Sequence, residues 1–241
     1  RPSALMSGAG NYSSAYSYEN SQVRISNFLT YIKQFGKHSL NVLLGQEAEK
    51  NKMQNVSAWG SQGVSDQIQV VTGFLQNNIG ANSDLQKWSQ LSYLGRFSYD
   101  FDSKYLFSGA VRADGSSRFG ENNKWGYFPS ASVGWILTEE DFLKNNPIFT
   151  LLKIRGSYGL TGSLPKSNYL QYNLYNVNNG GYQGNSGATS YNGQVAITPN
   201  FNNGVAQKNL SWERNRQWNL GADMELYKGR FTAMVDVFNK E

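Results

Sequence analysis

The segment from Tyr93 to Gly162 constrains the fold most, because apolar and polar residues alternate through four successive stretches of it. In the stretch that leads into it, one set of alternate positions is apolar or glycine: Leu91, Tyr93, Gly95, Phe97, Tyr99 and Phe101. The positions between them are polar, except for Leu94: Gln90, Ser92, Arg96, Ser98 and Asp100. Successive side chains of a strand point to opposite faces. The pattern therefore predicts strands with one apolar face and one hydrated face.

Alternation of this kind recurs along the chain and predicts eight antiparallel strands. They are expected at Gln22–Lys33, Ser39–Glu49, Gln90–Phe101, Tyr105–Ala113, Tyr127–Leu137, Leu151–Thr161, Trp212–Leu226 and Phe231–Asn239. Arg1–Asn20 is expected to be a loop. Pro129 cannot donate to a strand ladder, which favours a bulge there. Thr138 lies three residues before Asp141, a capping pattern that favours one helical turn.

The links between these strands alternate in length. Tight turns are expected at Gly36, Ser103, Asn145 and Gly229, and longer links at about 50–89, 114–124 and 163–208. This order places the tight turns at one end of the sheet and the long loops at the other, as in outer-membrane barrels with short periplasmic turns and long extracellular loops. A soluble β-sandwich has no reason to keep that polarity. The fold class expected is therefore all-β, an antiparallel transmembrane β-barrel segment.

Composition supports this fold and excludes several kinds of site. Only 39% of residues are hydrophobic and 16% are charged, while 14% are aromatic, which suits a barrel with a wet interior and aromatic belts at the lipid boundary. The chain has no cysteine and a single histidine, His38, so cysteine nucleophiles and multi-histidine metal sites are excluded. The net charge of +5 is scattered, and no nucleic-acid partner is expected. We expect no cofactor and no metal.

No apolar run approaches the ~20 residues of a membrane helix. The chain starts at Arg1 without a methionine and stops directly after an alternating segment. We therefore expect it to be an excerpt of a longer protein, and residues 1–241 to be part of one barrel domain.

Several ordered motifs in the second half of the chain resemble one family. They are RADGSSRFG at 112–120, KWGYFPS at 124–130, VGW at 133–135, LKIRGSYGLTG at 152–162, LSWE at 210–213 and QWNLG at 217–221. These motifs are similar to the barrel of SusC/RagA family TonB-dependent outer-membrane transporters. The motif positions to which the resemblance gives a structural role are Arg112, Asp114, Gly115, Arg118, Phe119, Gly120, Trp125, Gly126, Pro129 and Trp135.

The resemblance implies about eight strands of a barrel of about 22, located in the bacterial outer membrane and in contact with its lipid. It further implies a plug domain, TonB as the source of energy, a SusD-like surface lipoprotein as partner, and oligosaccharide or peptide cargo. The plug and the segment that binds TonB are expected to lie outside this chain.

Flat aromatic side chains in the expected long loops are the candidates for cargo contact, because they stack on sugar rings or peptide groups. They are Trp59, Tyr169, Tyr172, Tyr175, Tyr182 and Tyr191. The alternative is that these rings only pack the loops together. Arg112, Asp114 and Arg118 are expected to form a structural charged cluster.

No constellation of catalytic residues is present, and we expect no enzyme. The paired carboxylates at Glu139–Asp141 lack a partner base. A second class of function also explains loops rich in Tyr and Asn: a surface-exposed β-rich adhesin or carbohydrate-binding module. Solubility of the intact protein without detergent separates this class from the transporter.

Overall fold

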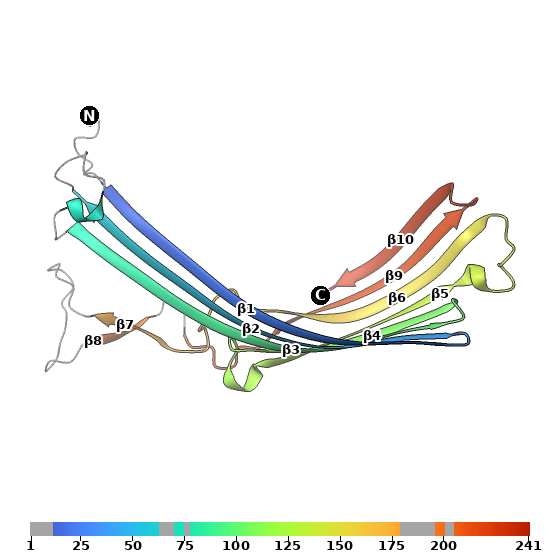
Figure 1. The fold of residues 1–241 in the computed structure, drawn as a ribbon, viewed down its shortest axis with the longest axis horizontal. Coiled ribbons are helices and arrows are strands. Elements are labelled where there is room, and N and C mark those ends of the chain that lie inside the picture. Colours follow the sequence, from blue (N-terminus) through green and yellow to red (C-terminus); the bar gives the residue numbers. More distant parts are fainter. Residues whose placement is uncertain (1–11, 63–69, 75–77, 179–195, 201–204) are drawn as a thin grey trace, which may run out of the picture. The chain divides into compact units, whose positions relative to one another are not determined.

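The computed structural model describes residues 12–62, 70–74, 78–178, 196–200 and 205–241. Its strands form an antiparallel eight-stranded sheet in the order β1-β2-β3-β4-β5-β6-β9-β10 and a separate hairpin of β7 and β8 (Figure 1). The strands are β1 (Tyr12–Phe35), β2 (His38–Ser61), β3 (Ile79–Phe101), β4 (Tyr105–Ser116), β5 (Trp125–Ile136), β6 (Phe149–Ser163), β7 (Leu174–Asn178), β8 (Ala196–Asn200), β9 (Glu213–Leu226) and β10 (Phe231–Lys240).

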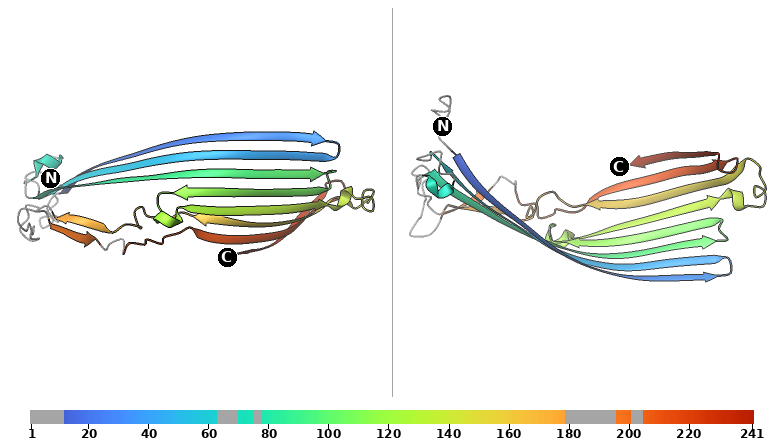
Figure 2. Two further views of the ribbon diagram at one scale, coloured as in Figure 1. Left: turned by 90° about the horizontal axis from the view of Figure 1, so that it is seen from below. Right: turned by 45° about the horizontal axis from the view of Figure 1, so that its top comes forward.

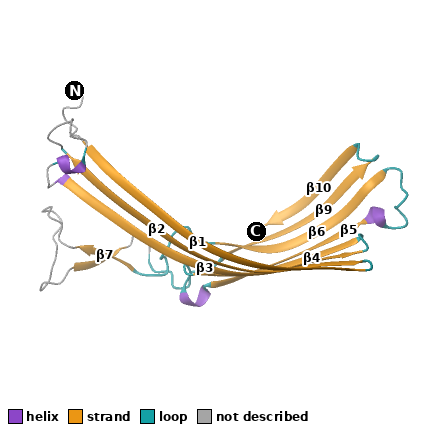
Figure 3. Cartoon of the chain, in the orientation of Figure 1, coloured by secondary structure: helices purple, strands orange, loops and turns teal. Residues whose placement is uncertain are grey.

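The described residues include three short 3-10 turns in the links (Figure 3). They are η2 (Val71–Gly73), η4 (Glu121–Asn123) and η5 (Leu137–Glu139). Among the described residues, no helix is long and apolar enough to cross a membrane.

The chain divides into two compact units. The first unit contains residues 1–23, 50–88 and 168–207, and the second contains residues 24–49, 89–167 and 208–241. All of the tight turns of the large sheet belong to the second unit, which also holds β4, β5, β6, β9 and β10 in full.

The tight turns lie together at one end of the second unit, as the link lengths predict (Figure 2). The backbone N–H of Asp102 donates to the carbonyl of Lys37 at 2.7 Å, and that of Tyr227 donates to the carbonyl of Ile148 at 2.9 Å. The β4–β5 link closes the opposite end, where Ser116 N–H donates to the carbonyl of Lys124 at 3.0 Å. The alternation of link lengths therefore corresponds to two distinct ends of the sheet.

The register of the ladders places the apolar residues of neighbouring strands on one face, which we call the apolar face. Phe107 lies opposite both Tyr99 and Val133, and Tyr158 lies opposite Trp218. These side chains are not covered within the chain: Phe97 is 47% exposed and Val133 is 54% exposed. A sandwich would bury such rows between two sheets, so an uncovered apolar face indicates a lipid-facing surface.

Aromatic rings border the apolar face at both ends. At the tight-turn end, ring centroids follow one another at 4.8 Å (Phe35–His38), 4.9 Å (His38–Phe101), 6.2 Å (Phe101–Tyr105) and 6.4 Å (Tyr105–Trp135). At the other end Tyr93 stacks on Trp125 at 6.1 Å. From Trp125 to Trp135 the strand rises about 33 Å, or about 25 Å along the normal for a tilt near 40°, which matches the apolar band of membrane barrels.

The strands of the first hairpins are longer than the alternation predicted. Tyr12–Asn20 belongs to β1, so the loop expected over Arg1–Asn20 is wrong from Tyr12 onward. β2 continues to Ser61 and β3 begins at Ile79, so the loop expected over 50–89 is wrong in its extent. Alternation fades in these extensions because both faces carry polar residues, whereas backbone ladders form irrespective of side-chain polarity. The link expected over 163–208 contains β7 and β8.

Two local expectations were wrong in detail. Pro129 pairs with Val111 in an unbroken register, without a bulge. The β5–β6 ladder begins only at Ser130, so no bond to β6 requires an N–H at residue 129. The helical turn expected near Thr138 is present as η5, but Thr138 lies inside it and does not cap it. Its hydroxyl accepts the N–H of Leu152 at 3.4 Å.

Candidate functional site

The face of the sheet opposite the apolar face carries hydroxyl, amide and charged side chains, and we call it the polar face. Ser108 and Ser132 hydrogen-bond across β4 and β5 at 2.7 Å. The exceptional Leu94 also lies here, beside Gly45, where the Phe28 ring covers the glycine. The departure of Leu94 from the alternation therefore reflects a small apolar contact between neighbouring strands on the polar face.

One ion-pair cluster of the polar face is built around Arg112. Its Nε donates to Asp114 Oδ1 at 2.8 Å and to Oδ2 at 2.9 Å. Its Nη2 lies 3.3 Å from Ser92 Oγ and 3.6 Å from Glu47 Oε2. Asp114 is only 5% exposed, and a buried carboxylate needs such a partner. The cluster therefore fixes the side chains of three neighbouring strands, β2, β3 and β4.

A second cluster lies around Arg155 and joins β6, β9 and β10. The Nε of Arg155 donates to Asp223 at 3.1 Å, and its Nη2 lies 2.8 Å from Asp236 Oδ1. The Nη1 also donates to the Asn219 amide oxygen at 3.4 Å. A Cβ at Gly221 would lie 2.8 Å from the Cζ of Arg155. The glycine therefore leaves room for the guanidinium to lie flat over the ladder.

The family-like motifs meet in an aromatic cluster, the rim cluster, formed by Phe119, Phe128 and Trp212 with Leu164 and Leu210 packed against it. Phe119 is 2% exposed, and its ring centroid lies 4.5 Å from that of Trp212. Phe128 meets Trp212 edge-on at 5.3 Å. The indole N–H of Trp212 donates to the carbonyl of Lys124 at 3.0 Å. The cluster therefore anchors the β4–β5 link on the start of β9.

Three motif glycines make room for the rim cluster. A Cβ at Gly126 would lie 2.6 Å from the Phe128 ring and 2.8 Å from Trp212. A Cβ at Gly120 would collide with the carbonyl oxygen of Lys208, and one at Gly162 with the Phe128 ring. Any side chain at these positions would displace an aromatic ring or the backbone. These glycines thus have a packing role.

The remaining motif residues lie elsewhere on the sheet. Trp125 is on the apolar face and covers Gly115, where a Cβ would lie 2.9 Å from the indole. Arg118 was expected in a cluster with Arg112 and Asp114; its Nη1 donates to the carbonyl of Pro165 at 3.4 Å. The indole N–H of Trp135 donates to Glu140 Oε1 at 3.1 Å. Residues of these motifs therefore contribute packing and hydrogen bonds on both faces and at both ends of the sheet.

Glu140 is the centre of hydrogen bonding at the tight-turn end. Its carboxylate accepts the Tyr105 hydroxyl at 2.6 Å and lies 3.4 Å from the ammonium of Lys104. The hydrogen bonds from Tyr105 and Trp135 hold the pKa of Glu140 below its ordinary value. At another turn, the hydrogen bond from Lys37 lowers the pKa of Asp102. Both carboxylates therefore keep their charge to a lower pH than an ordinary carboxylate does.

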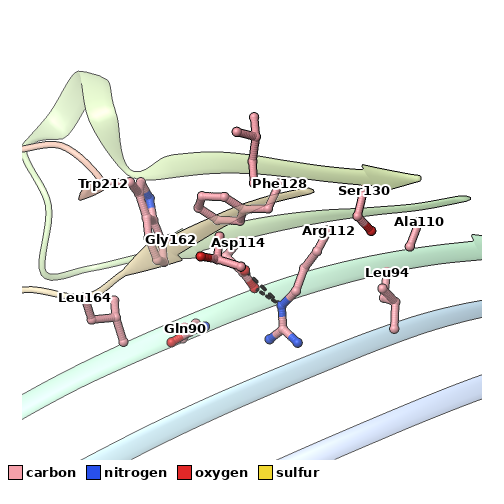
Figure 4. Close-up of a pocket in the computed structure, with 12 residues that line it drawn as sticks. Gln90, Leu94, Ala110, Arg112, Asp114, Phe128, Ser130, Gly162, Leu164 and Trp212 are labelled. Carbon is pink, nitrogen blue, oxygen red and sulfur yellow. Dashed lines mark hydrogen bonds and ion pairs between the residues drawn. The ribbon is translucent and has the colours of Figure 1, made fainter. Parts of the chain in front are cut away.

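A hollow of about 450 Å³ opens on the polar face between these features (Figure 4). Arg112 and Asp114 stand at its centre, and Phe128, Gly162 and Trp212 close one end. Gln90 and Leu94 line it from β3, and Ser130 lines it from β5. The hollow thus presents one cation, one carboxylate, one amide, two hydroxyl groups and an aromatic surface together.

The described residues contain no group of three or more His, Cys, Asp or Glu side chains placed to hold a metal ion.

The candidate cargo residues fall into three groups. Trp59 lies over Gly80, and the hydroxyl of Tyr169 bonds to both the N–H (2.7 Å) and the carbonyl (3.2 Å) of Lys87. The β3–β4 ladder stops at Gln90, so Tyr169 satisfies backbone groups that β4 does not reach. Tyr172 and Tyr175 are 60% and 57% exposed. Tyr182 and Tyr191 lie outside the described residues.

Comparison with known proteins identifies the family. The family described as "TonB dependent receptor-like, beta-barrel" matches residues 2–241. The chain belongs to this family. It is 32% identical over 250 residues to TonB-dependent receptor P3 of Formosa agariphila, which covers 99% of this chain and 23% of that protein. It is 33% identical over 216 residues to TonB-dependent receptor SusC of Bacteroides thetaiotaomicron, which covers 87% of this chain and 20% of that protein.

Solved structures show the same fold for this TonB-dependent receptor barrel. The RagAB peptide importer in its "closed-closed" state superposes with a TM-score of 0.81 at 25% identity, over 94% of this chain and 24% of the importer chain. The RagAB peptide transporter gives a TM-score of 0.81 at 23% identity, over the same shares. The chain thus spans about a quarter of its relatives, and its open sheet is a segment of their barrel. The resemblance to the SusC/RagA family is confirmed.

Membership of this family gives each face of the sheet its orientation. In a membrane barrel the apolar face points outward to lipid and the polar face inward to the lumen. The Arg112 cluster, the Arg155 cluster and the hollow therefore line the lumen. The uncovered apolar face and the family favour a membrane barrel over the alternative of an adhesin or carbohydrate-binding module.

Sequence reasoning missed the Arg155 cluster and the hydrogen bonds that Glu140 accepts from Tyr105 and Trp135. Asp223 and Asp236 occupy polar-face positions of strands that are apolar on the other face. This pattern in the sequence places both carboxylates on the polar face. Their common partner was not predictable, because β6 and β9 are separated by more than forty residues of link yet pair directly.

Proposed function

We propose that the complete protein is a TonB-dependent importer of the outer membrane, and that residues 1–241 form part of its single barrel domain. Its cargo is an oligosaccharide or a peptide, and a SusD-like surface lipoprotein delivers it. The protein binds and moves its cargo without chemical conversion. The observation that supports this proposal is that the sheet has an uncovered apolar face and an opposite face with charged side chains, in a chain of this family.

The side chains on the lumen surface are suited to bind a cargo that is polar and flexible. The guanidinium groups of Arg112 and Arg155 are each held by at least two oxygen partners, so they present a fixed pattern of charge. Fixed hydrogen-bonding groups lose little entropy when a ligand docks. Exposed Tyr172 and Tyr175 add flat surfaces in the link between β6 and β9. We propose these two tyrosines as contacts for incoming cargo.

Uptake by whole cells tests the proposal. A strain that lacks the gene should lose growth on one oligosaccharide or peptide source, and a fluorescent oligomer of that source should no longer enter the periplasm. The complete gene should restore both. Deleting TonB, or the gene for the lipoprotein partner, should give the same loss. Normal uptake in the deletion strain of every oligomer tested would refute the proposal.

A triple substitution of Tyr172, Tyr175 and Tyr182 by alanine tests the role of the loop tyrosines. If they contact cargo, uptake falls while the amount of folded barrel stays constant. The matched control is Tyr127→Ala, which removes a 57% exposed ring from the apolar face and leaves cargo contact intact. Unchanged uptake in the triple variant would refute the role of these tyrosines in cargo contact.

A further inference from the structure

We propose that the hollow around Arg112 and Asp114 receives the side chain of a lysine or arginine from a segment of the same chain that lies outside residues 1–241 and occupies the barrel lumen. The inference rests on the barrel proposed for the complete protein and is independent of cargo. Every residue that lines the hollow belongs to the second compact unit.

Asp114 is the group in the hollow with the greatest need of a further partner. Its side chain is only 8% exposed, and among the described residues its two oxygens share one donor, the Nε–H of Arg112. An ionised carboxylate has about four lone-pair sites, and a buried charge that lacks hydrogen bonds is costly. Asp114 can therefore accept further hydrogen bonds from a group that enters the hollow.

The charges at the hollow favour a cation as that group. The guanidinium of Arg112 lies 2.8 Å from Asp114 Oδ1 and 3.6 Å from Glu47 Oε2. One guanidinium and two carboxylates together carry an excess of one negative charge. A cation that enters the hollow balances this excess, whereas an anion is repelled by it.

The lining of the hollow suits a long side chain with a polar end. Leu94 and Leu164 provide apolar surface, and the Gln90 amide and the Ser130 hydroxyl add hydrogen-bond acceptors (Figure 4). Lysine and arginine carry three or more N–H donors at the end of an apolar stem. The stem can therefore pack on the leucines while the donors bond to Asp114 and the other acceptors.

A segment of the same chain is the occupant that the observations favour. Most of the lining comes from the motifs at 112–120, 124–130, 152–162 and 210–213, which ties the hollow to the barrel of this family rather than to one cargo. This chain covers 23% of TonB-dependent receptor P3, so most of that protein lies outside the matched region. The lumen of a barrel of about 22 strands is filled by a plug. The lumen-filling part of the complete protein is therefore the source of the cation.

Photo-cross-linking of the complete protein, purified without added oligomer and placed in a lipid bilayer, identifies the occupant. The photoreactive residue p-benzoylphenylalanine replaces Ser130, which is exposed and lines the hollow. As a control it replaces Val133, which lies on the apolar face. Mass spectrometry of the digested protein locates each cross-link.

Position 130 should cross-link to one segment outside residues 1–241 that carries a lysine or arginine within a few residues of the cross-link, and position 133 should not. The proposal is overturned if position 130 gives no such cross-link, or if it reacts only with a lipoprotein partner or with a co-purified oligomer.

A double-mutant cycle then tests the charge. The variants are Asp114→Asn, methionine in place of the cation beside the cross-link, and both changes together. The control is Glu121→Gln, which alters an exposed carboxylate that does not line the hollow. The heat-dependent mobility of folded barrels in gels confirms that each variant folds.

Hydrogen exchange of the cross-linked segment should become about tenfold to hundredfold faster in each single variant, because each loses a hydrogen bond to a charged group. It should be no faster in the double variant, and unchanged in Glu121→Gln. Unchanged exchange in both single variants would overturn the proposal, and so would effects that add fully in the double variant, since only independent sites add. Failure of the import proposal would appear instead as normal uptake in the deletion strain, which neither of these measurements uses.

Discussion

Removing the Phe119 side chain should release the link between β4 and β5. Phe119 is 2% exposed and stacks on Trp212 at 4.5 Å. A buried aromatic side chain removes about 150–250 Å² from water, or about 4–6 kcal/mol at 25 cal/mol/Å². Alanine retains part of this area, so Phe119→Ala should cost about 3–5 kcal/mol. Local opening of the link should then become about 10² to 5 × 10³ times more frequent, at about 1.4 kcal/mol per factor of ten.

Hydrogen exchange of the complete protein in lipid measures this opening. The informative amides are those of Gly120, which donates to the Leu210 carbonyl at 3.2 Å, and of Ser117, which donates to the Ser89 carbonyl at 3.0 Å. The matched control is Phe142→Ala, since Phe142 is 71% exposed and its loss should change little. Protection of both amides within about threefold of the unmodified protein would refute the role of the rim cluster, and so would an equal loss of protection in Phe142→Ala.

Three further outcomes follow from the contacts. Val133→Arg should destabilise the barrel by about 2–4 kcal/mol, because it places a charge in lipid, whereas Ser132→Arg should destabilise it much less. Urea titrations of the folded barrel in bilayers compare the two variants. Tyr169→Phe should accelerate hydrogen exchange of the Lys87 amide, which loses its hydroxyl partner, and Tyr172→Phe should leave it unchanged. The pKa of Glu140 is lowered in the folded protein, so its ionised carboxylate stabilises the fold at pH values above the ordinary glutamate pKa of about 4.3. This stabilisation is lost as the pH falls through the lower pKa of the folded state. Thermal unfolding measured against pH should show the loss, and Glu140→Gln should abolish this pH dependence.

The fold was predictable from the sequence wherever one face of a strand meets lipid. There the alternation of residues such as Phe97 and Ser98 fixes both the strand and its orientation. In the outer parts of β1, β2 and β3 the alternation fades, because water on both faces imposes no constraint on side-chain polarity. The strands continue there, and only the pairing of backbone groups could have revealed them.

The polar face was less predictable than the apolar face. Arg112 and Asp114 are two residues apart on one strand, so their proximity follows from the period of two. Arg155 meets Asp223 and Asp236 across three strands, and this meeting depends on a register that the long link before β9 hides. The glycines of the rim cluster were visible as motif positions, but most of the groups that require them, such as Trp212 beside Gly126 and Phe128 beside Gly162, lie on distant segments.

The accessibility of spin labels to oxygen and to a nickel chelate distinguishes the lipid-facing side of the sheet from the water-facing side. The chain has no cysteine, so single cysteines can carry the labels in the complete protein, kept free of other cysteines, in a lipid bilayer. One set of labels is placed at Phe97, Val133 and Leu220, and the other at Ser108, Ser132 and Asn219. We predict that the first set is accessible to oxygen and shielded from the nickel chelate, and that the second set shows the reverse. The same accessibility for both sets would contradict a sheet with one face in lipid and the other in water.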